Sequence, residues 1–588
     1  MEALLGLLDF FHAILASVTG VGAALALGGV AFAAFALGDV ARTGTALERH
    51  VRRSARWVAL GASLAALGDL AHLGLTVLAV RGVSSEWVSA LFDASFFRAY
   101  LALVAAAALC AAGARGLAAG EASARRRRAA QLAAALGALG LALGGAFTSH
   151  AEGRLAGRAP LLVLDAVHRA AAYAWLGGVA HLALFGAARP NPVELKSVLP
   201  RAATLFATCV GVLVVAGALL ALPYVGTPAA LVGSSYGLLI LAKGMLLAGL
   251  LGIAASNHRS VARIARGEGT ADLSLWRFAE LEVGLGLAAL FVAGTLASTP
   301  PGVDIPQLAR GSEVAHVFAQ GWRDLVQQGR NAFDMERVGV SIFNHRFSGS
   351  LLVAMSLLAI AERAARGFGT RSRARWARGV ARGARNWPLL LLALGVFVIV
   401  HSERQAWPFG RIGFVDSFTD PEIVEHRLAG LLVVGFAFFE WAVRTERLRP
   451  NRAGLVFPAI CLLGSGLLIV HSHAGIGARD ELLIQVTHLP IAILGVVAGV
   501  ARWLELRLPG SEARRIGWLW PLALLGIGLI LLGYWEPPRA VPDPRDAFLA
   551  PVVLASRRTY GRGAHSGCAA YIAWVRSSVD STMQRERM

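Results

Sequence analysis

Long apolar runs constrain the fold of this chain more than any other feature. Stretches of about twenty apolar residues recur from the N-terminal region to about residue 534, and the mean hydropathy is +0.59. Each run is long enough to cross the roughly 30 Å hydrocarbon core of a bilayer as a helix. A helix satisfies its own backbone hydrogen bonds, as a lipid environment requires. The runs exclude a soluble globule and predict an all-α, polytopic integral membrane helix bundle.

We expect about fourteen transmembrane helices in two units of eight and six. Their predicted positions are 6–37, 57–80, 96–114, 129–149, 160–186, 203–222, 234–256, 278–298, 341–361, 387–401, 424–442, 454–471, 482–501 and 516–534. No basic segment or small-residue cleavage site accompanies the first run, so we interpret it as a retained helix.

Changes in composition predict four domains. They are an eight-helix membrane domain at 1–302, a periplasmic linker segment at 303–338, a six-helix His-rich membrane domain at 339–536 and a disordered periplasmic tail at 537–588. Within the linker, residues 314–326 have the pattern of an amphipathic surface helix.

The formal net charge of +19 is distributed unevenly between the loops. Arg125 to Arg128, and the arginines between Arg363 and Arg385, fall in loops on one side of the predicted topology. The positive-inside rule makes that side the inner one and places both termini outside. The charge therefore needs no nucleic-acid partner, and the lipid bilayer is the expected environment.

Several functional classes leave no trace in the sequence. The four cysteines are scattered, and the six methionines form no array for soft metal ions. No phosphate-binding loop of the GxxxxGK[ST] type occurs, so the chain is not an ATP-driven pump by itself. We expect no enzyme, and any metal would be held mainly by nitrogen and oxygen.

The histidines are the main candidate ligands. An ionisable residue inside a membrane span is costly unless it is paired or hydrated, so it is a functional candidate. Of the fifteen histidines, ten lie in or at the outer ends of predicted spans: His12, His72, His150, His168, His345, His401, His426, His471, His473 and His488.

Three of these histidines follow an aspartate by three residues, in Asp9-Phe-Phe-His12, Asp69-Leu-Ala-His72 and Asp165-Ala-Val-His168. Residues i and i+3 share a helix face, so the aspartate can ligate the same ion or accept the second imidazole N–H. The candidate metal ligands of the first unit are therefore His12, Asp69, His72, His150, Asp165 and His168. The alternative is that each pair is a satisfied interior hydrogen bond.

The second unit contains a repeat built around its histidines. Asn344-His345-Arg346-Phe347-Ser348-Gly349 opens one span and Glu425-His426-Arg427-Leu428-Ala429-Gly430 opens another, while Val400-His401-Ser402 and Val470-His471-Ser472 each close one. With His473 and His488 this makes six candidate ligands, more than one metal site needs. The alternative is that they are interfacial groups that bond to outer loops.

Two charged residues lie deeper in the predicted spans of the first unit. Lys243 lies near the middle of its span and Glu282 near the inner end of the next. A pair between them would neutralise both charges, and structural pairing and a role in gating or proton coupling both stay open.

The first unit resembles the copper resistance protein D (CopD) family of bacterial inner-membrane proteins. The resemblance covers roughly 1–302, with an extra six-helix unit after it, and is carried by Thr148-Ser149-His150-Ala151, Asp165 to Gly178, Ser235-Tyr236-Gly237 with Lys243, Leu281-Glu282 and Ser298-Thr299-Pro300-Pro301. It implies copper as the ion, transport or homeostasis across the bacterial inner membrane, and a small periplasmic copper-binding partner of the CopC type. It also implies that His150, Asp165 and His168 are copper ligands.

Two other functions stay open on sequence grounds. Histidines on facing helices, such as His345 with His426 or His401 with His471, would suit a bis-histidine haem in a membrane cytochrome. A factor that delivers copper to a membrane oxidase would use the same ligands without transport.

Overall fold

The structure is a computed structural model of the 588-residue chain that describes residues 8–38, 45–81, 87–120, 123–268, 273–305, 308–367, 379, 382–401, 403, 406–419, 421–449, 453–470 and 478–536. The regular elements in these ranges are all helical, and twelve helices are long and apolar enough to cross a membrane. The predicted all-α membrane fold is confirmed. The predicted tail at 537–588 lies outside the described residues.

The described chain forms two compact units. We call residues 8–231 with 239–305 the first unit, and residues 232–238 with 308–536 the second unit.

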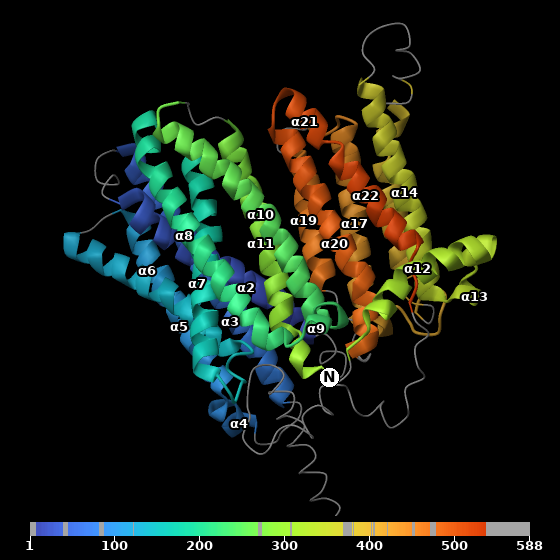
Figure 1. Cartoon of the computed structure of the whole chain (residues 1–588), viewed down its shortest axis with the longest axis horizontal. Helices are drawn as coiled ribbons and strands as arrows, with labels where there is room; N and C mark the ends of the chain where they lie inside the picture. The colour runs from blue at the N-terminus through green and yellow to red at the C-terminus, as the bar shows by residue number, and fades with distance from the viewer. Residues whose placement is uncertain are drawn as a thin grey trace, which may run out of the picture. The chain divides into compact units, whose positions relative to one another are not determined.

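The first unit is a bundle of long helices that run side by side (Figure 1). Its elements are α2 (Leu8–Ala31), η1 (Phe32–Leu37), α3 (Thr45–Arg81), α4 (Trp87–Asp93), α5 (Ser95–Ala119), α6 (Ala124–Gly144), η3 (Gly145–Thr148), α7 (Arg158–Ala187), α8 (Pro192–Val225), α9 (Pro228–Gly233), α10 (Ser235–Ala265), α11 (Leu273–Ser298) and η4 (Gly302–Asp304). Helix α2 lies at the centre of this unit, because it packs against α3, α7 and α11.

Glycines allow α2 and α7 to approach backbone to backbone. A Cβ atom on Gly177 would overlap the carbonyl oxygen of Ala24, and one on Gly28 would overlap the backbone of Gly177. Lipid chains give apolar side chains no reason to prefer each other, so membrane helices associate where small residues permit close packing. The position of α2 therefore depends on these glycines.

The second unit contains a further set of long helices, and its residues 311–328 form a helix that runs in another direction (Figure 1). Its elements are α12 (Gly311–Gln328), η5 (Gly329–Phe333), α13 (Met335–Val338), α14 (Val340–Gly367), α16 (Pro388–Val400), η6 (Asp416–Thr419), α17 (Pro421–Arg444), α19 (Val456–Val470), α20 (Ala478–Arg507), α21 (Gly510–Ile516) and α22 (Leu519–Leu532). Helix α14 packs on α22, α16 on α17, and α20 on both α19 and α22.

Two predicted spans of the second unit are weaker than the other twelve. Helix α19 has only 15 residues. Helix α17 has 24 residues, but Arg427, Glu440 and Arg444 interrupt its apolar sequence. The charges near its end are paired, because Arg444 lies 2.6 Å from Glu440 and 3.1 Å from Glu362.

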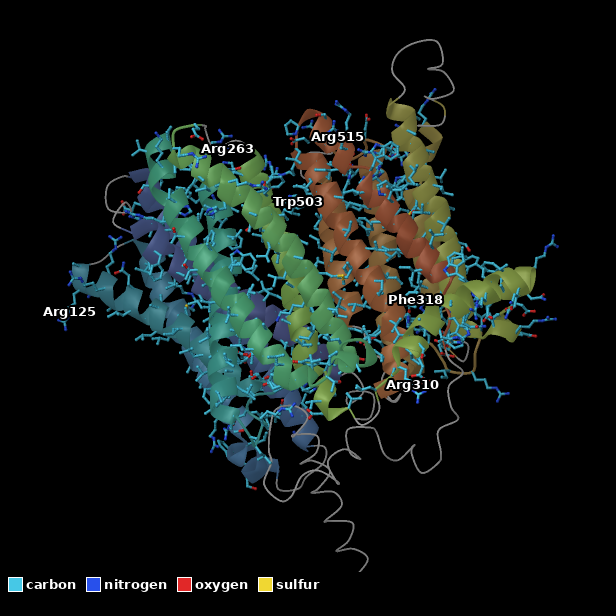
Figure 2. All side chains as sticks on the ribbon, in the orientation of Figure 1. Arg125, Arg263, Arg310, Phe318, Trp503 and Arg515 are labelled. Carbon is cyan, nitrogen blue, oxygen red and sulfur yellow. The ribbon has the colours of Figure 1, made fainter. Side chains whose placement is uncertain are left out.

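Helix α12 is the amphipathic helix predicted at 314–326. Phe318, Trp322 and Val326 are spaced one turn apart and are 37%, 40% and 78% exposed, whereas Val317 is buried. Figure 2 shows Phe318 on α12 and Arg310 just before it. An exposed apolar stripe on an otherwise polar helix is typical of a helix that lies in the headgroup region.

The packing of α2 on α7 makes the first testable prediction. We expect Gly177→Ala to lower the thermal unfolding midpoint of the detergent-solubilised protein, because its methyl group overlaps Ala24 and overpacking costs about 1–3 kcal/mol. Gly211→Ala is the matched control, since a Cβ there meets no atom within 4 Å. Equal midpoints for the two variants, measured by fluorescence-detected size exclusion after heating, would contradict this account of the packing.

Candidate metal centres

The structure brings His12 and His72 together in the first unit. His12 lies on α2 and His72 on α3, both are buried, and their ring centroids are 5.3 Å apart with the planes only 25° from parallel. The ring of Tyr100 on α5 also stacks on His72, with centroids 5.3 Å apart. Three helices thus contribute to one column of rings.

Backbone carbonyl groups surround the nitrogens of His72. Its Nδ1 lies 3.2 Å from the carbonyl oxygen of Gly68, and its Nε2 lies 3.2 Å from that of His12. A neutral imidazole has one N–H, so it can donate to only one of these oxygens at a time. The lone pair of the other nitrogen then faces a carbonyl oxygen 3.2 Å away.

Asp69 is buried beside this column, with only 1% of its surface exposed. Its Oδ2 atom has no hydrogen-bond partner among the described residues. The carbonyl oxygens of Gly68 and His12 lie at the two ring nitrogens of His72. They occupy the place that the i, i+3 spacing predicted for the carboxylate of Asp69. The side chain of Asp9, the corresponding aspartate for His12, lies outside the described residues.

His150 lies in the turn between η3 and α7, outside the spans. Its Nε2 is 3.1 Å from the carbonyl oxygen of Leu296 on α11, and its ring lies 6.1 Å from that of Tyr224. Burial lowers the pKa of His150 below its usual value. The ring is therefore neutral near pH 7, with Nε2 donating and the lone pair on Nδ1.

His168 on α7 is fixed by contacts with two neighbouring helices. Its Nδ1 is 3.2 Å from the carbonyl oxygen of Leu213 on α8, and its Nε2 is 3.4 Å from Nζ of Lys243 on α10. Because a carbonyl only accepts, Nδ1 carries the proton, and the lone pair on Nε2 faces Lys243. Gly217 leaves room for this ring, since a Cβ there would lie 2.9 Å from its Cε1.

Asp165 is engaged by an arginine and not by His168. Its Oδ2 accepts a hydrogen bond of 2.8 Å from Nε of Arg169, one turn further along α7. A charged guanidinium is a stronger partner for a carboxylate than a neutral imidazole N–H. Asp165 therefore acts on His168 and Lys243 through its negative charge, which interacts electrostatically with both.

Lys243 and Glu282, whose pairing was one of two possibilities on sequence grounds, do not form a pair. Lys243 meets His168, while Oε1 of Glu282 accepts a hydrogen bond of 2.8 Å from Nδ2 of Asn257. Lys243 and Asn257 are fourteen residues apart on α10, a rise of about 21 Å. Glu282 on α11 lies at the level of Asn257, too far along α10 for Lys243 to reach.

In the second unit, His345 and His488 come together around Tyr534. The rings of His345 on α14 and His488 on α20 are 5.6 Å apart, and Tyr534 stacks on His345 at 3.7 Å. Each histidine directs Nδ1 at the carbonyl of the preceding turn, Ser341 at 2.8 Å and Ile484 at 2.9 Å. Both rings therefore carry their lone pair on Nε2.

The other histidines of the second unit are placed separately. His401, beyond the end of α16, stacks on Phe397 with centroids 4.7 Å apart, and burial lowers its pKa below the usual value. His426 lies half-buried on α17 and interacts electrostatically with His488. His471 and His473 lie outside the described residues.

The repeated motif also has a structural role that its histidines do not reveal. Arg346 donates a hydrogen bond of 3.0 Å to the carbonyl of Ala332, and Arg427 donates one of 2.9 Å to the carbonyl of Trp407. Both arginines are buried, so each ties a connecting segment to the start of its helix. The repeated arginine therefore has the same structural role in α14 and in α17.

Among the predicted ligands, the rings of His12 and His72 meet, as do those of His345 and His488. Within the described ranges, no three His, Cys, Asp or Glu side chains come close enough together to hold a metal ion. A divalent ion in a protein usually takes four or more ligands, whereas Cu(I) is stable with two or three. Sequence reasoning missed the aromatic partners Tyr100 and Tyr534, because no spacing rule links them to the histidines.

One comparison with known proteins gives a match. Residues 196–296 match the family model of copper resistance protein D, which confirms the resemblance for this part of the chain. The matched residues run from α8 through α11 and include Lys243 and Glu282, while His150 and His168 precede them. No curated protein and no solved structure matches the chain.

The contact between Lys243 and His168 makes the second prediction. We expect Lys243→Met to tighten copper binding at His168 by about tenfold to a hundredfold, because a unit charge at this range is worth roughly 1.5–3 kcal/mol. The affinity is measured by competition with a chromogenic chelator. Lys196→Met, at an exposed position near the start of α8, is the matched control and leaves the affinity unchanged. Weaker binding by Lys243→Met than by wild type would contradict a competing role for the ammonium group.

Proposed function

We propose that this chain binds copper ions from the outer side of a bacterial inner membrane and moves or buffers them. The observation that carries the proposal is the match of residues 196–296 to copper resistance protein D, together with the contact between Lys243 in that region and His168. The contact links the matched helices to the histidines of the first unit. Copper is the substrate, and no catalytic role is assigned to any residue.

The chemistry of the buried histidines supports copper. Neutral imidazole nitrogens suit copper in both oxidation states. His150 and His168 each have one ring nitrogen at a backbone carbonyl, which orients the ring and directs the lone pair elsewhere. A ring held in this way loses little freedom when a metal binds.

In this proposal Lys243 controls the access of a cation to His168. An incoming cation meets the lone pair on Nε2 only after Nζ of Lys243 has moved or lost its proton, because the two atoms are 3.4 Å apart. Asp165 offsets the positive charge of Lys243, but its bond to Arg169 keeps it from neutralising a second cation fully. Occupation of the site therefore depends on the state of Lys243.

We infer that copper arrives from a periplasmic carrier, such as a small copper-binding protein of the CopC type. The predicted outer side contains the turn with His150 and the start of α7. That turn is held by two ion pairs, Arg154 with Asp304 at 2.8 Å and Arg158 with Glu152. A rigid turn of this kind suits transfer from a docked carrier, and the inferred direction is uptake.

The second unit adds a separate pair of ligands in this proposal. His345 and His488 both direct Nε2 away from their own helix backbone, and Tyr534 stacks on one of the two rings. Their arrangement supports temporary binding of an ion by two imidazoles. With His401, His426, His471 and His473, this unit would buffer copper in addition to the first unit.

Metal analysis tests the proposal. We expect the purified wild-type chain, loaded with copper and desalted, to retain copper, and a His150→Ala/His168→Ala double variant to lose at least one equivalent per chain. His258→Ala is the matched control, because His258 is exposed on α10. Visible and electron paramagnetic resonance spectra of the same samples report on nitrogen ligation.

Two outcomes would overturn the proposal. Copper content that stays the same in the double variant would remove His150 and His168 from the site. A preparation that shows a Soret band and holds no copper would identify a membrane cytochrome instead.

A further inference from the structure

A second group of buried polar side chains lies in the first unit, away from His12 and His72. It consists of His50 and Ser54 on α3, His181 on α7 and the backbone of Leu25 on α2. The positive-inside rule predicts that these helix ends are the inner ones. None of the candidate ligands predicted from the sequence belongs to this group.

His181 is completely buried and held at both ring nitrogens. Nε2 lies 3.1 Å from the carbonyl oxygen of Leu25, and Nδ1 lies 2.6 Å from Oγ of Ser54. The carbonyl only accepts, so Nε2 carries the proton and Nδ1 accepts from the serine hydroxyl. The carbonyl fixes the ring with its lone pair directed at α3, an orientation typical of histidines that ligate metals.

Gly29 on α2 leaves the space that His181 occupies. A Cβ atom on Gly29 would lie 2.5 Å from Nε2 of His181. The ring therefore lies directly against the backbone of α2, and a larger residue at this position would displace it.

His50 is the unusual member of the group. It is only 3% exposed, and neither of its ring nitrogens has a hydrogen-bond partner in the described part of the chain. Its ring contacts Phe185 at 5.1 Å and Phe32 at 6.4 Å between centroids. A buried polar group without a partner is costly, so a histidine in this position needs an explanation.

His50 and His181 lie one turn apart along the contact between α3 and α7. His50 lies one turn before Ser54 on α3, and Phe185 lies one turn after His181 on α7. Ser54 meets His181 while His50 meets Phe185, so the two helices are antiparallel here and the pairs are adjacent. His50 and His181 are close enough to interact electrostatically.

The surroundings restrict the kind of ion that would fit. Phe32 and Phe185 contact His50, the exposed Arg53 acts on it electrostatically, and the donors are two imidazole nitrogens and one hydroxyl. In the ranges that the structure describes, no third His, Cys, Asp or Glu completes a ligand set. Two neutral nitrogens suit a monovalent closed-shell ion such as Cu(I) or Ag(I), and a single charge loses less hydration energy on burial than a double one.

We propose that His50 and His181 form an inner binding site for a monovalent soft cation, Cu(I) in the cell. This inference rests on the proposed function and adds a second position for its substrate. When the ion binds, Nδ1 of His181 exchanges the hydroxyl of Ser54 for the cation, and His50 supplies the other nitrogen. The hydroxyl of Ser54 then turns to the carbonyl of His50 one turn earlier in α3, a common bond for serine in helices.

The inner site lies on the same helices as the outer histidines. The carbonyl of His12 meets His72, and the carbonyl of Leu25 meets His181. These two carbonyls are thirteen residues apart on α2, a rise of about 20 Å. The two groups therefore lie at well-separated depths of one helix bundle.

Silver binding to the full-length chain tests the inner site, because Ag(I) mimics Cu(I) and does not change oxidation state under the assay conditions. The detergent-purified protein is loaded with Ag(I), desalted and analysed by mass spectrometry for silver per chain. We expect His50→Phe to lose one equivalent, while its phenyl ring keeps the packing against Phe32 and Phe185. His258→Phe, at an exposed position of α10, is the matched control and keeps the full content.

Ser54→Ala gives a second readout that a purely structural role would not produce. Removing the hydroxyl that competes for Nδ1 of His181 is expected to tighten Ag(I) binding about fivefold, the worth of one neutral hydrogen bond. Unchanged or weaker binding by Ser54→Ala would overturn the exchange at Nδ1.

The failure of this inference differs from the failure of the proposed function. If His50→Phe retains as much silver as wild type while His150→Ala/His168→Ala loses silver, the inner site is overturned and the proposed function stands. If wild type binds neither silver nor copper, the proposed function fails and the inner site fails with it.

Discussion

A buried imidazole must find an acceptor for its N–H, and between membrane helices the nearest acceptors are backbone carbonyls. In this protein His72, His150, His168 and His181 all place a ring nitrogen near a carbonyl of a neighbouring helix, and His345 and His488 use their own preceding turn. Except at His72, which has a carbonyl at both ring nitrogens, each such bond fixes which nitrogen keeps the lone pair. The chemistry available to the protein follows from that choice.

Close packing of the helices makes these bonds possible. The carbonyl of Leu25 reaches His181 because Gly28 and Gly29 bring the backbone of α2 against α7, where larger side chains would overlap their neighbours. Gly217 on α8 likewise leaves room for the ring of His168, which lies on α7. The small residues that hold the bundle together are thus also the residues that shape its histidine sites.

The sequence predicted the helices well because their determinants are local. Apolar length sets each span, and the alternation of polar and apolar residues at 314–326 predicted α12 before the structure was known. The pattern at 424–442 was also sufficient to predict α17, although charged residues interrupt its apolar sequence. Only the amino acids within each segment were needed for these predictions.

The partners of the polar residues were harder to predict because they depend on the register between helices. Asp165 has His168 at i+3 and Arg169 at i+4 on the same face, and spacing alone does not choose between them. The guanidinium wins because its hydrogen bond joins two full charges. Lys243 likewise finds His168 on another helix, at a depth that the sequence of α10 does not encode.

The result is a set of sites in which the aspartates do not act as the motif suggests. Asp165 is held by Arg169, so its charge reaches His168 and Lys243 only across space. Arg169 and Lys243 add two positive charges near one carboxylate, and a bound cation would add a third. An ion can therefore stay at His168 only if Lys243 yields, because the ammonium group contacts the ring directly. His50 and His181 offer two neutral nitrogens beside Phe32 and Phe185, and there the exposed Arg53 acts on His50 electrostatically.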